Sequence, residues 1–150
     1  TEENKYGPVV VGVDGSEVSR RATEVAFEEA AARGAELHAV HTWVDTQIQG
    51  PGAGYAVSED HWKAVQAEKD ELLSSYLNEL SEQYPDVVVK KAITRDRPVR
   101  ALAAAAQGAQ LLVTGSHGRG GFKGMLLGST SRALLQEAPC PMMVVRTQDL

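Results

Sequence analysis

Glycine and hydroxyl residues are concentrated in one segment of the sequence, at a spacing that could bind an anion. The segment follows the pattern G-x2-G-x9-G-S and continues with two more hydroxyl residues, so its key positions are Gly115, Gly118, Gly128, Ser129, Thr130 and Ser131. Glycines let backbone N–H groups approach a ligand closely, and three hydroxyl residues exceed what a helix cap requires. A helix predicted to begin at Ser129 adds the positive end of its dipole. The segment favours phosphate binding over an ordinary flexible connection.

Several well-known phosphate and nucleophile motifs do not fit the chain. Lys123 is followed by Gly124, which excludes the pattern G-x-x-x-x-G-K-[ST], and the first predicted strand ends without a G-x-G-x-x-G. Ser116 does not stand in the G-x-S-x-G pattern of a nucleophile elbow. Because no base is paired with a nucleophile, the sequence indicates binding more than turnover, and slow hydrolysis of a ligand stays open.

Four other side chains could contact a ligand or a metal ion. Asp14 follows the first predicted strand, where it could cap the next helix or bind a ligand or magnesium, and its place at a strand end favours ligand contact. His38 and His41 lie three residues apart on a predicted strand, so they point to opposite faces and a shared metal ion is not expected. His117 could contact a phosphate or only shape the turn, and we assign it no catalytic role.

The elements that would position these residues alternate between strands and helices. Apolar β-branched runs predict five strands, at residues 8–13, 37–43, 87–93, 110–114 and 142–146. Caps and apolar periodicity predict four helices, which begin at Ser16, Ser58, Pro98 and Ser129. Regular alternation of this kind predicts an α/β fold with a parallel sheet and helices on both faces. A Gly/Pro-rich loop at 49–54 is typical of a mobile flap.

Length and composition restrict the function classes. The chain has 150 residues, which predicts one domain over residues 1–150. Its 15 basic and 20 acidic residues give a net charge of −5, which disfavours nucleic-acid binding. A single cysteine, Cys140, and no apolar signal or membrane-spanning run predict a cytoplasmic protein with no membrane association. The chain begins at Thr1, so whether it is processed, trimmed or one module of a tandem protein stays open.

Three segments in the correct order give the chain a resemblance to the universal stress protein family. They are the glycine pattern of residues 115–129, the opening run Val9–Ser16 and the closing run Cys140–Arg146. The likeness extends over essentially the whole chain. It implies a Rossmann-like adenine-nucleotide-binding fold, with five parallel strands in the order 3-2-1-4-5 and a topological switch point between the first and fourth strands.

The resemblance also implies an ATP-binding site with residues in stated roles. On the adenosine side, Asp14 would accept hydrogen bonds from the ribose and the backbone of Thr42 would contact adenine. The remaining residues expected near the adenosine are Gly12, Val13, Thr114 and Gly115. Those expected at the phosphates are His117, Gly118, Arg119, Gly120, Gly128, Ser129, Thr130 and Ser131. Mg²⁺ would bridge the phosphates, and no protein side chain is assigned to it.

One position departs from the family pattern, since Asp96 stands where many members have glycine. A carboxylate in the cleft would weaken triphosphate binding or favour a metal ion, whereas the usual exposure of Asp favours a solvent-facing side chain. The resemblance implies a nucleotide-dependent switch in stress or dormancy responses, with at most weak ATP hydrolysis. The alternatives are an AMP or cyclic AMP binder and an interaction module without ATP. The resemblance further implies a homodimer through residues Pro141 to Arg146, or the equivalent pairing with a tandem module.

Overall fold

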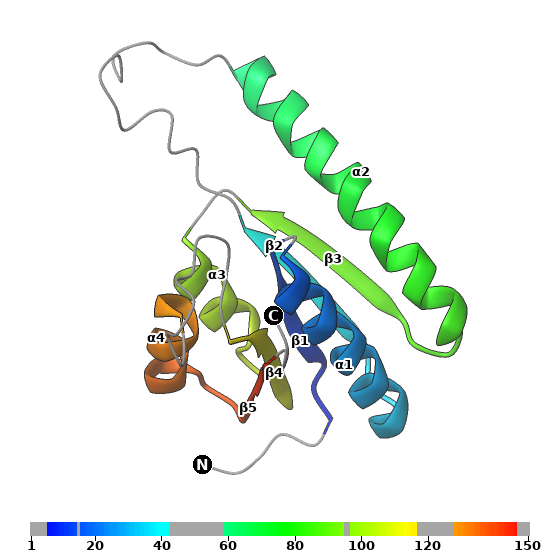
Figure 1. Cartoon of the computed structure of the whole chain (residues 1–150), viewed down its shortest axis with the longest axis vertical. Coiled ribbons are helices and arrows are strands. Elements are labelled where there is room, and N and C mark those ends of the chain that lie inside the picture. The colour runs from blue at the N-terminus through cyan, green and yellow to red at the C-terminus, as the bar shows by residue number, and fades with distance from the viewer. Residues whose placement is uncertain (1–5, 15, 43–58, 95–96, 117–127, 147–150) are drawn as a thin grey trace.

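Five parallel strands form one sheet in the order β3-β2-β1-β4-β5, which confirms the predicted α/β fold and strand order. The structure is a computed structural model that describes residues 6–14, 16–42, 59–94, 97–116 and 128–146. The predicted flap at 49–54 lies outside these residues. Strands and helices alternate along the chain as expected (Figure 1). The strands are β1 (Val9–Val13), β2 (Leu37–Thr42), β3 (Val89–Thr94), β4 (Leu111–Gly115) and β5 (Met142–Val145), and the helices are α1 (Glu17–Arg33), α2 (Glu59–Gln83), α3 (Pro98–Ala105) and α4 (Ser129–Glu137).

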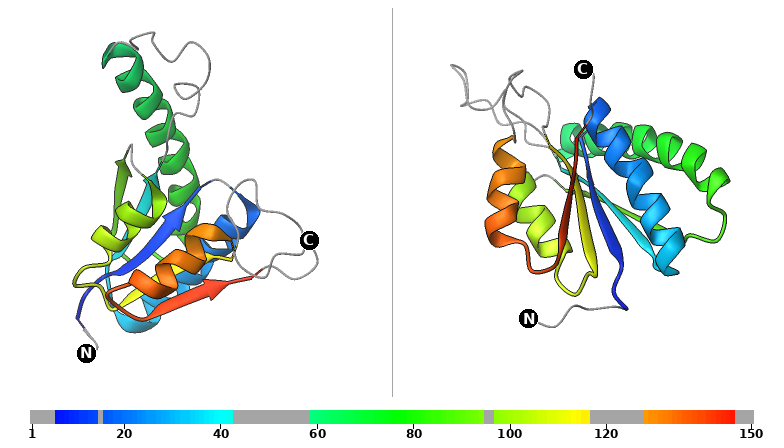
Figure 2. Two further views of the ribbon diagram at one scale, coloured as in Figure 1. Left: turned by 90° about the vertical axis from the view of Figure 1, so that its left-hand side faces the viewer. Right: turned by 60° about the horizontal axis from the view of Figure 1, so that its bottom comes forward.

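Helices cover both faces of the sheet, with α1 and α2 on one face and α3 and α4 on the other (Figure 2). Side chains alternate along each strand, so Val9, Val11 and Val13 of β1 pack on the α1 and α2 side while Val10 packs on the α3 and α4 side. All four valines are buried. This burial on both faces explains why the strand sequence shows no polar alternation.

Helix α1 begins and ends with the predicted caps. Ser16 Oγ accepts a hydrogen bond from the backbone N–H of Ser19 at 3.1 Å. Gly34 ends the helix in the left-handed conformation, with φ of 64°, and its N–H donates to the last turn. Because its start is fixed by a side-chain cap, α1 holds a defined position directly after β1.

Only the C-terminal half of α2 packs closely on the sheet. Its buried residues are Leu73, Leu77 and Leu80, whereas Leu72 is 66% exposed. The apolar residues of this segment predict one packed face made of Val65, Leu72, Leu73, Tyr76, Leu77 and Leu80, and this prediction is wrong for Leu72. The N-terminal half of the helix extends beyond the end of the sheet, as Figure 1 shows, so apolar periodicity alone overstates its burial.

The third strand begins two residues later than predicted. Val87 N–H donates to the carbonyl oxygen of Tyr84 at 3.1 Å, so Val87 belongs to the turn after α2. Ladder pairing starts at Val89, opposite Leu37. Strand β3 is one edge of the sheet and carries the exposed residues Lys90 and Lys91, a composition that discourages pairing with another chain. No helix in the described part of the chain is long and apolar enough to cross a membrane.

Candidate functional site

A cavity of about 100 Å³ opens at the carboxyl ends of the strands, where β1 and β4 lie side by side. The chain leaves β1 for one side of the sheet and β4 for the other, which makes this the topological switch point of the fold. Strands, loops and the first turns of helices contribute the lining residues. They are Gly12, Val13, Asp14, Ser19, Val40, Thr42, Pro98, Leu102, Thr114, Gly115, Thr130 and Ser131.

Eight of the fourteen site residues expected from the sequence line this cavity. They are Gly12, Val13, Asp14, Thr42, Thr114, Gly115, Thr130 and Ser131. Gly128 and Ser129 stand beside them at the start of α4, outside the lining itself. His117, Gly118, Arg119 and Gly120 lie outside the described residues, as does Asp96. Residues far apart in sequence therefore converge at the expected edge of the sheet.

Asp14 does not cap α1, whose N-cap is Ser16, but it stabilises the turn before the helix and also lines the cavity. Its Oδ1 accepts a hydrogen bond from the Ser16 N–H at 2.8 Å, which holds the turn before α1. Its own N–H donates to Ser19 Oγ at 3.0 Å. The half-buried carboxylate also lines the cavity. A carboxylate fixed in this way is positioned to accept hydrogen bonds from a ligand that carries hydroxyl groups.

Thr114 places an unpaired hydroxyl at the cavity. The residue is 4% exposed, and its Oγ1 has no hydrogen-bond partner among the described residues. Burying an unpaired hydroxyl costs roughly 1–3 kcal/mol, and the large majority of buried polar side chains have a partner. A polar ligand in the cavity would supply the missing partner for Thr114.

The start of α4 presents backbone donors to the same cavity. Gly128 is the N-cap and no side chain caps the helix. The N–H groups of the first turn, at Ser129, Thr130 and Ser131, have no acceptor within the helix. Together with the helix dipole they attract an anion. This arrangement supports the phosphate-binding expectation for the first turn of α4.

Ser131 has a structural role that the sequence did not predict. Its side chain is buried, and its Oγ donates to the carbonyl oxygen of Gly115 at 2.6 Å. A serine hydroxyl has one hydrogen, so this bond uses its only donor. Ser131 therefore offers an anion its backbone N–H, while its side chain holds α4 against the end of β4.

Position 115 has room only for glycine, because α1 packs against it. A Cβ atom at this position would lie 2.4 Å from Cγ1 of Val18 and 3.3 Å from the Val18 backbone carbon. At Gly12 the nearest atom would be a terminal methyl group of Leu102, at 2.9 Å. The glycine pattern predicts close approach of a ligand at Gly115, and the structure adds a packing requirement at the same position.

Sequence reasoning missed Ser19, Val40, Pro98 and Leu102, which complete the cavity wall. Ser19 is buried, one turn into α1, and its only sequence signal is the spacing of three residues from the cap Ser16. Leu102 and Val40 belong to the apolar cluster between the sheet and α3, so they read as ordinary core residues. Their apolar surfaces suit the flat face of an aromatic ring.

The two histidines of β2 lie on opposite faces of the strand, as predicted. His41 Nδ1 lies 2.7 Å from the carbonyl oxygen of Val13, on the side of α1 and α2. His38 Nε2 is buried without a partner among the described residues. Within the described ranges, no three or more His, Cys, Asp or Glu side chains group to hold a metal ion.

Comparison with known proteins gives matches along nearly the whole chain. Residues 5–146 match the universal stress protein family. Universal stress protein Rv2005c of Mycobacterium tuberculosis is 48% identical over 143 residues, which are 95% of this chain and 46% of that protein. Universal stress protein Rv1996 of the same organism is 46% identical over 142 residues, 94% of this chain and 44% of that protein. The chain thus spans less than half the length of these relatives.

Solved structures agree with the fold. The universal stress protein UspA from Lactobacillus plantarum superimposes with a TM-score of 0.76 at 21% identity, over 94% of this chain and 98% of that one. A universal stress protein whose crystal structure is a complex with cAMP gives a TM-score of 0.64 at 26% identity, over 95% and 98% of the two chains. The family match, the close relatives and the strand order together show that this chain belongs to the universal stress protein family.

Proposed function

We propose that the cavity at the ends of β1 and β4 binds an adenine nucleotide. The observation that carries the proposal is the buried, unpaired hydroxyl of Thr114, which lies in a cavity that the first turn of α4 also lines. A nucleotide combines hydroxyl groups, an aromatic base and an anion, and the cavity offers a partner for each. The complex of a related universal stress protein with cAMP supports the same ligand class.

Each part of the nucleotide has an expected position. The ribose lies near the Asp14 carboxylate and the Thr114 hydroxyl, which can accept and donate hydrogen bonds. The base lies against apolar surfaces such as Val40 and Leu102, with the backbone of Thr42 beside it. The phosphates lie at the first turn of α4, where Ser129 and Thr130 present N–H groups.

We propose ATP as the nucleotide because the sequence retains the full G-x2-G-x9-G-S pattern. His117, Gly118, Arg119 and Gly120 would extend the phosphate contacts begun by α4. A Mg²⁺ ion held by the phosphates would neutralise part of their charge. The domain would act as a nucleotide-dependent switch in a stress response. It would have at most weak hydrolytic activity, since no base is paired with a nucleophile among the described residues that line the cavity.

A single substitution separates the binding role of Thr114 from its contribution to folding. Thr114→Val removes the unpaired hydroxyl, so the nucleotide-free protein should become more stable by about 1 kcal/mol. The same substitution should weaken nucleotide binding, because the ligand loses a partner. Thr23→Val is the matched control: its buried hydroxyl already donates to the Ser19 carbonyl oxygen at 2.8 Å, so its loss should not stabilise the protein.

Thermal unfolding with and without ligand, together with calorimetric titration, measures both effects. Ligand that binds only the folded state raises the unfolding temperature, and the added stability grows with the logarithm of the ligand concentration divided by its Kd. The proposal fails if neither ATP with Mg²⁺, AMP nor cyclic AMP stabilises the wild-type protein. It also loses its main support if Thr114→Val leaves nucleotide affinity unchanged.

A preference for AMP or cyclic AMP is the second candidate, favoured by the complex of the related protein with cAMP. A triphosphate site should be stabilised by ATP with Mg²⁺ far more than by AMP, whereas a monophosphate site should not distinguish them. Denaturing freshly purified protein and identifying any released nucleotide by mass spectrometry gives an independent answer. A domain that neither retains nor binds any nucleotide would instead be an interaction module.

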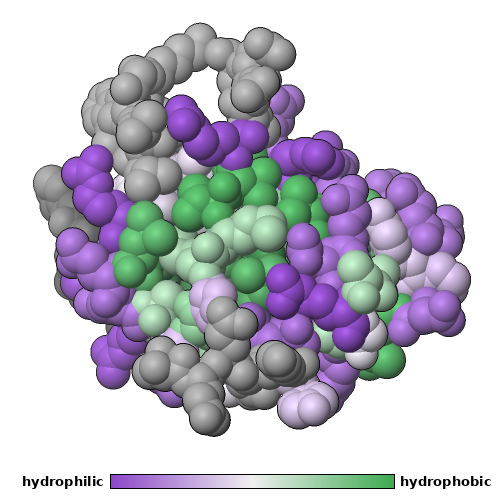
Figure 3. Space-filling view, turned by 90° about the horizontal axis from the view of Figure 1, so that it is seen from below, coloured by the Kyte–Doolittle hydropathy of each residue, from purple (hydrophilic) through white to green (hydrophobic). Residues whose placement is uncertain are grey.

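We also propose that residues 1–150 form one universal stress protein domain that works in the cytoplasm and pairs through β5. Strand β5 is an edge of the sheet, and its residues Met142, Met143 and Val144 are partly exposed. The right-hand view of Figure 2 brings β5 toward the reader, and Figure 3 is turned further in the same direction. On this face Figure 3 shows apolar side chains gathered together and bordered by hydrophilic ones. The partner would be a second copy of this chain or an equivalent module of a longer protein.

Backbone geometry provides a clean test of this pairing. The carbonyl oxygen of Pro141 accepts a hydrogen bond from Leu112 of β4, and that of Val145 accepts one from Ser116 directly after β4. Because backbone groups alternate in direction along a strand, those of Met142 and Val144 point away from β4. Val144→Pro removes one outward N–H and keeps the bonds to β4. Analytical ultracentrifugation should show a dimer that this variant weakens, whereas wild-type protein that stays monomeric at high concentration contradicts the proposed homodimer.

A further inference from the structure

A second cavity, of about 270 Å³, lies on the opposite side of the sheet from the site described above. It is bounded by the end of β1, the end of β2, the first turns of α1 and the middle of α2. The lining residues are Val13, Asp14, Arg20, His41, Lys69, Leu72, Leu73 and Tyr76. Val13 and Asp14 line both cavities, so the end of β1 is a shared wall of the two.

The charges that line this cavity favour an anion. Arg20 and Lys69 contribute positive charge from two different helices, and Asp14 is the acidic residue among the described lining side chains. One oxygen of the Asp14 carboxylate already accepts a hydrogen bond from the Ser16 N–H. The described lining side chains thus carry two cationic groups and one carboxylate, in a chain whose net charge is −5.

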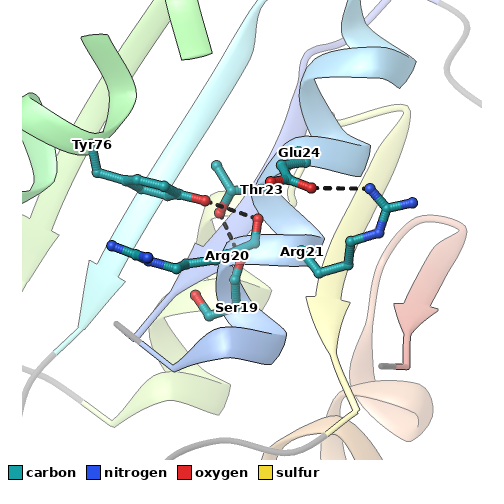
Figure 4. A network of polar contacts seen from close by, with 6 residues as sticks. All are labelled: Ser19, Arg20, Arg21, Thr23, Glu24 and Tyr76. Carbon is teal, nitrogen blue, oxygen red and sulfur yellow. Dashed lines mark hydrogen bonds and ion pairs between the residues drawn. The ribbon is translucent and has the colours of Figure 1, made fainter. Parts of the chain in front are cut away.

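Contacts with Tyr76 hold Arg20 in place at this cavity. The Arg20 guanidinium lies 5.2 Å from the centre of the Tyr76 ring, within the range of a cation–π interaction. The Tyr76 hydroxyl donates to the carbonyl oxygen of Arg20 at 2.9 Å. Figure 4 shows the Arg20 side chain extended beside the Tyr76 ring, whereas Arg21 points away toward Glu24. The guanidinium of this exposed residue therefore lies beside the ring at the wall of the cavity.

His41 adds a polar group whose tautomer is fixed. Its Nδ1 lies 2.7 Å from the carbonyl oxygen of Val13, and a carbonyl can only accept, so Nδ1 carries the hydrogen. This bond orients the ring at the end of β2, next to the second cavity. The imidazole is therefore held in one orientation at the wall of the cavity.

The remaining wall is apolar and incompletely covered. Leu73 is buried, and Leu72 beside it is 66% exposed. The volume lies just below the range of about 300–1,000 Å³ that is typical of small-molecule sites, which indicates a small ligand. A ligand with an apolar body would cover Leu72 while its charged end met the cations.

From these features we propose that the second cavity binds a small organic anion, with a carboxylate or phosphate group at Arg20 and Lys69 and an aromatic or branched apolar body against Leu72 and Tyr76. The proposal does not depend on nucleotide binding in the first cavity. Benzoate and phenyl phosphate carry the two anionic groups on the same ring, and benzyl alcohol is a neutral probe of similar size.

Titration of isotope-labelled protein with each probe, followed by amide chemical shifts, locates any binding. Benzoate or phenyl phosphate should shift the amide signals of His41, Lys69, Leu72 and Tyr76, and benzyl alcohol should bind more weakly. Arg20→Gln should weaken binding of the anions by about tenfold or more, because a charge-assisted hydrogen bond is lost. Arg20→Lys keeps the charge and should retain most of the affinity.

Arg21→Gln is the matched control, because Arg21 stands next to Arg20 on α1 and pairs with Glu24 at 3.0 Å outside the cavity. It should leave probe binding unchanged. Shifts confined to Thr130 and Ser131 would mean that phenyl phosphate binds at the start of α4 and would overturn the proposal. Equal loss of affinity in Arg20→Gln and Arg21→Gln, or no preference for anions over benzyl alcohol, would overturn it as well.

Discussion

Gly115 and Val18 lie so close together that a side chain on the glycine has no room: its Cβ would come within 2.4 Å of Val18 Cγ1. This contact packs the first turn of α1 onto the end of β4. Both segments also contribute to the cavity at the switch point, through Ser19 and through Thr114 and Gly115. The site geometry therefore depends on a packing contact that involves no ligand.

Gly115→Ala should destabilise the fold by about 1–3 kcal/mol through overpacking. In a Val18→Ala background the same substitution should cost less, because alanine lacks the Cγ1 atom that makes the closest contact. Gly12→Ala is the comparison variant and should cost less, since the atoms nearest to its Cβ all belong to the flexible side chain of Leu102 and none to backbone. Urea unfolding of the four variants measures these effects, and equal costs of Gly115→Ala in both backgrounds would contradict the assignment.

Ser131 and Ser129 should respond differently to the same substitution. Ser131→Ala leaves the Gly115 carbonyl oxygen without its bond at 2.6 Å, so we expect a loss of about 1–3 kcal/mol in unfolding free energy. Ser129 is exposed at the start of α4, and Ser129→Ala should change stability by at most about 0.5 kcal/mol. Chemical denaturation distinguishes them, and similar stability losses in the two variants would argue against the Ser131 bond as a structural link.

Ionisation of Tyr76 should lower the free energy of unfolding as pH rises in the alkaline range. Burial, with added repulsion from the Glu24 carboxylate, raises the pKa of Tyr76 from 10.0 to about 12. Between these two pKa values the folded protein keeps the phenol neutral while the unfolded chain ionises it. The contribution of Tyr76 to the free energy of unfolding is therefore complete below pH 10.0 and is lost as pH rises through about 12. Unfolding free energies measured across this window should fall more steeply for the wild type than for Tyr76→Phe. Parallel curves would show that Tyr76 does not titrate as expected.

Cys140 should be a slow nucleophile. Partial burial raises the pKa of its thiol, which lowers the fraction of reactive thiolate near neutral pH. Because it is the single cysteine of the chain, alkylation by iodoacetamide reports on it directly. The folded protein should react more slowly than the same protein in denaturant, which serves as the control. Equal rates in the two states would contradict the effect of burial.

The sequence alone determined the order of the elements and most of their bounds. Apolar β-branched runs, the Ser16 cap and the glycine after α1 are local signals, and each depends on only a few neighbouring residues. The resemblance to the universal stress protein family supplied the strand order, which local patterns do not contain. It also indicated the edge of the sheet at which Asp14, Thr114 and Thr130 meet.

Only the tertiary structure decided how individual side chains are used. Leu72 is one of the apolar residues of α2, yet it is 66% exposed while the adjacent Leu73 is buried, because neighbouring residues of a helix point about 100° apart. Ser131 bonds to Gly115 across 16 positions of the sequence, and Arg20 contacts Tyr76 from another helix. Contacts between such distant residues depend on how the elements pack in space, and the periodicity of a single segment carries no record of that packing.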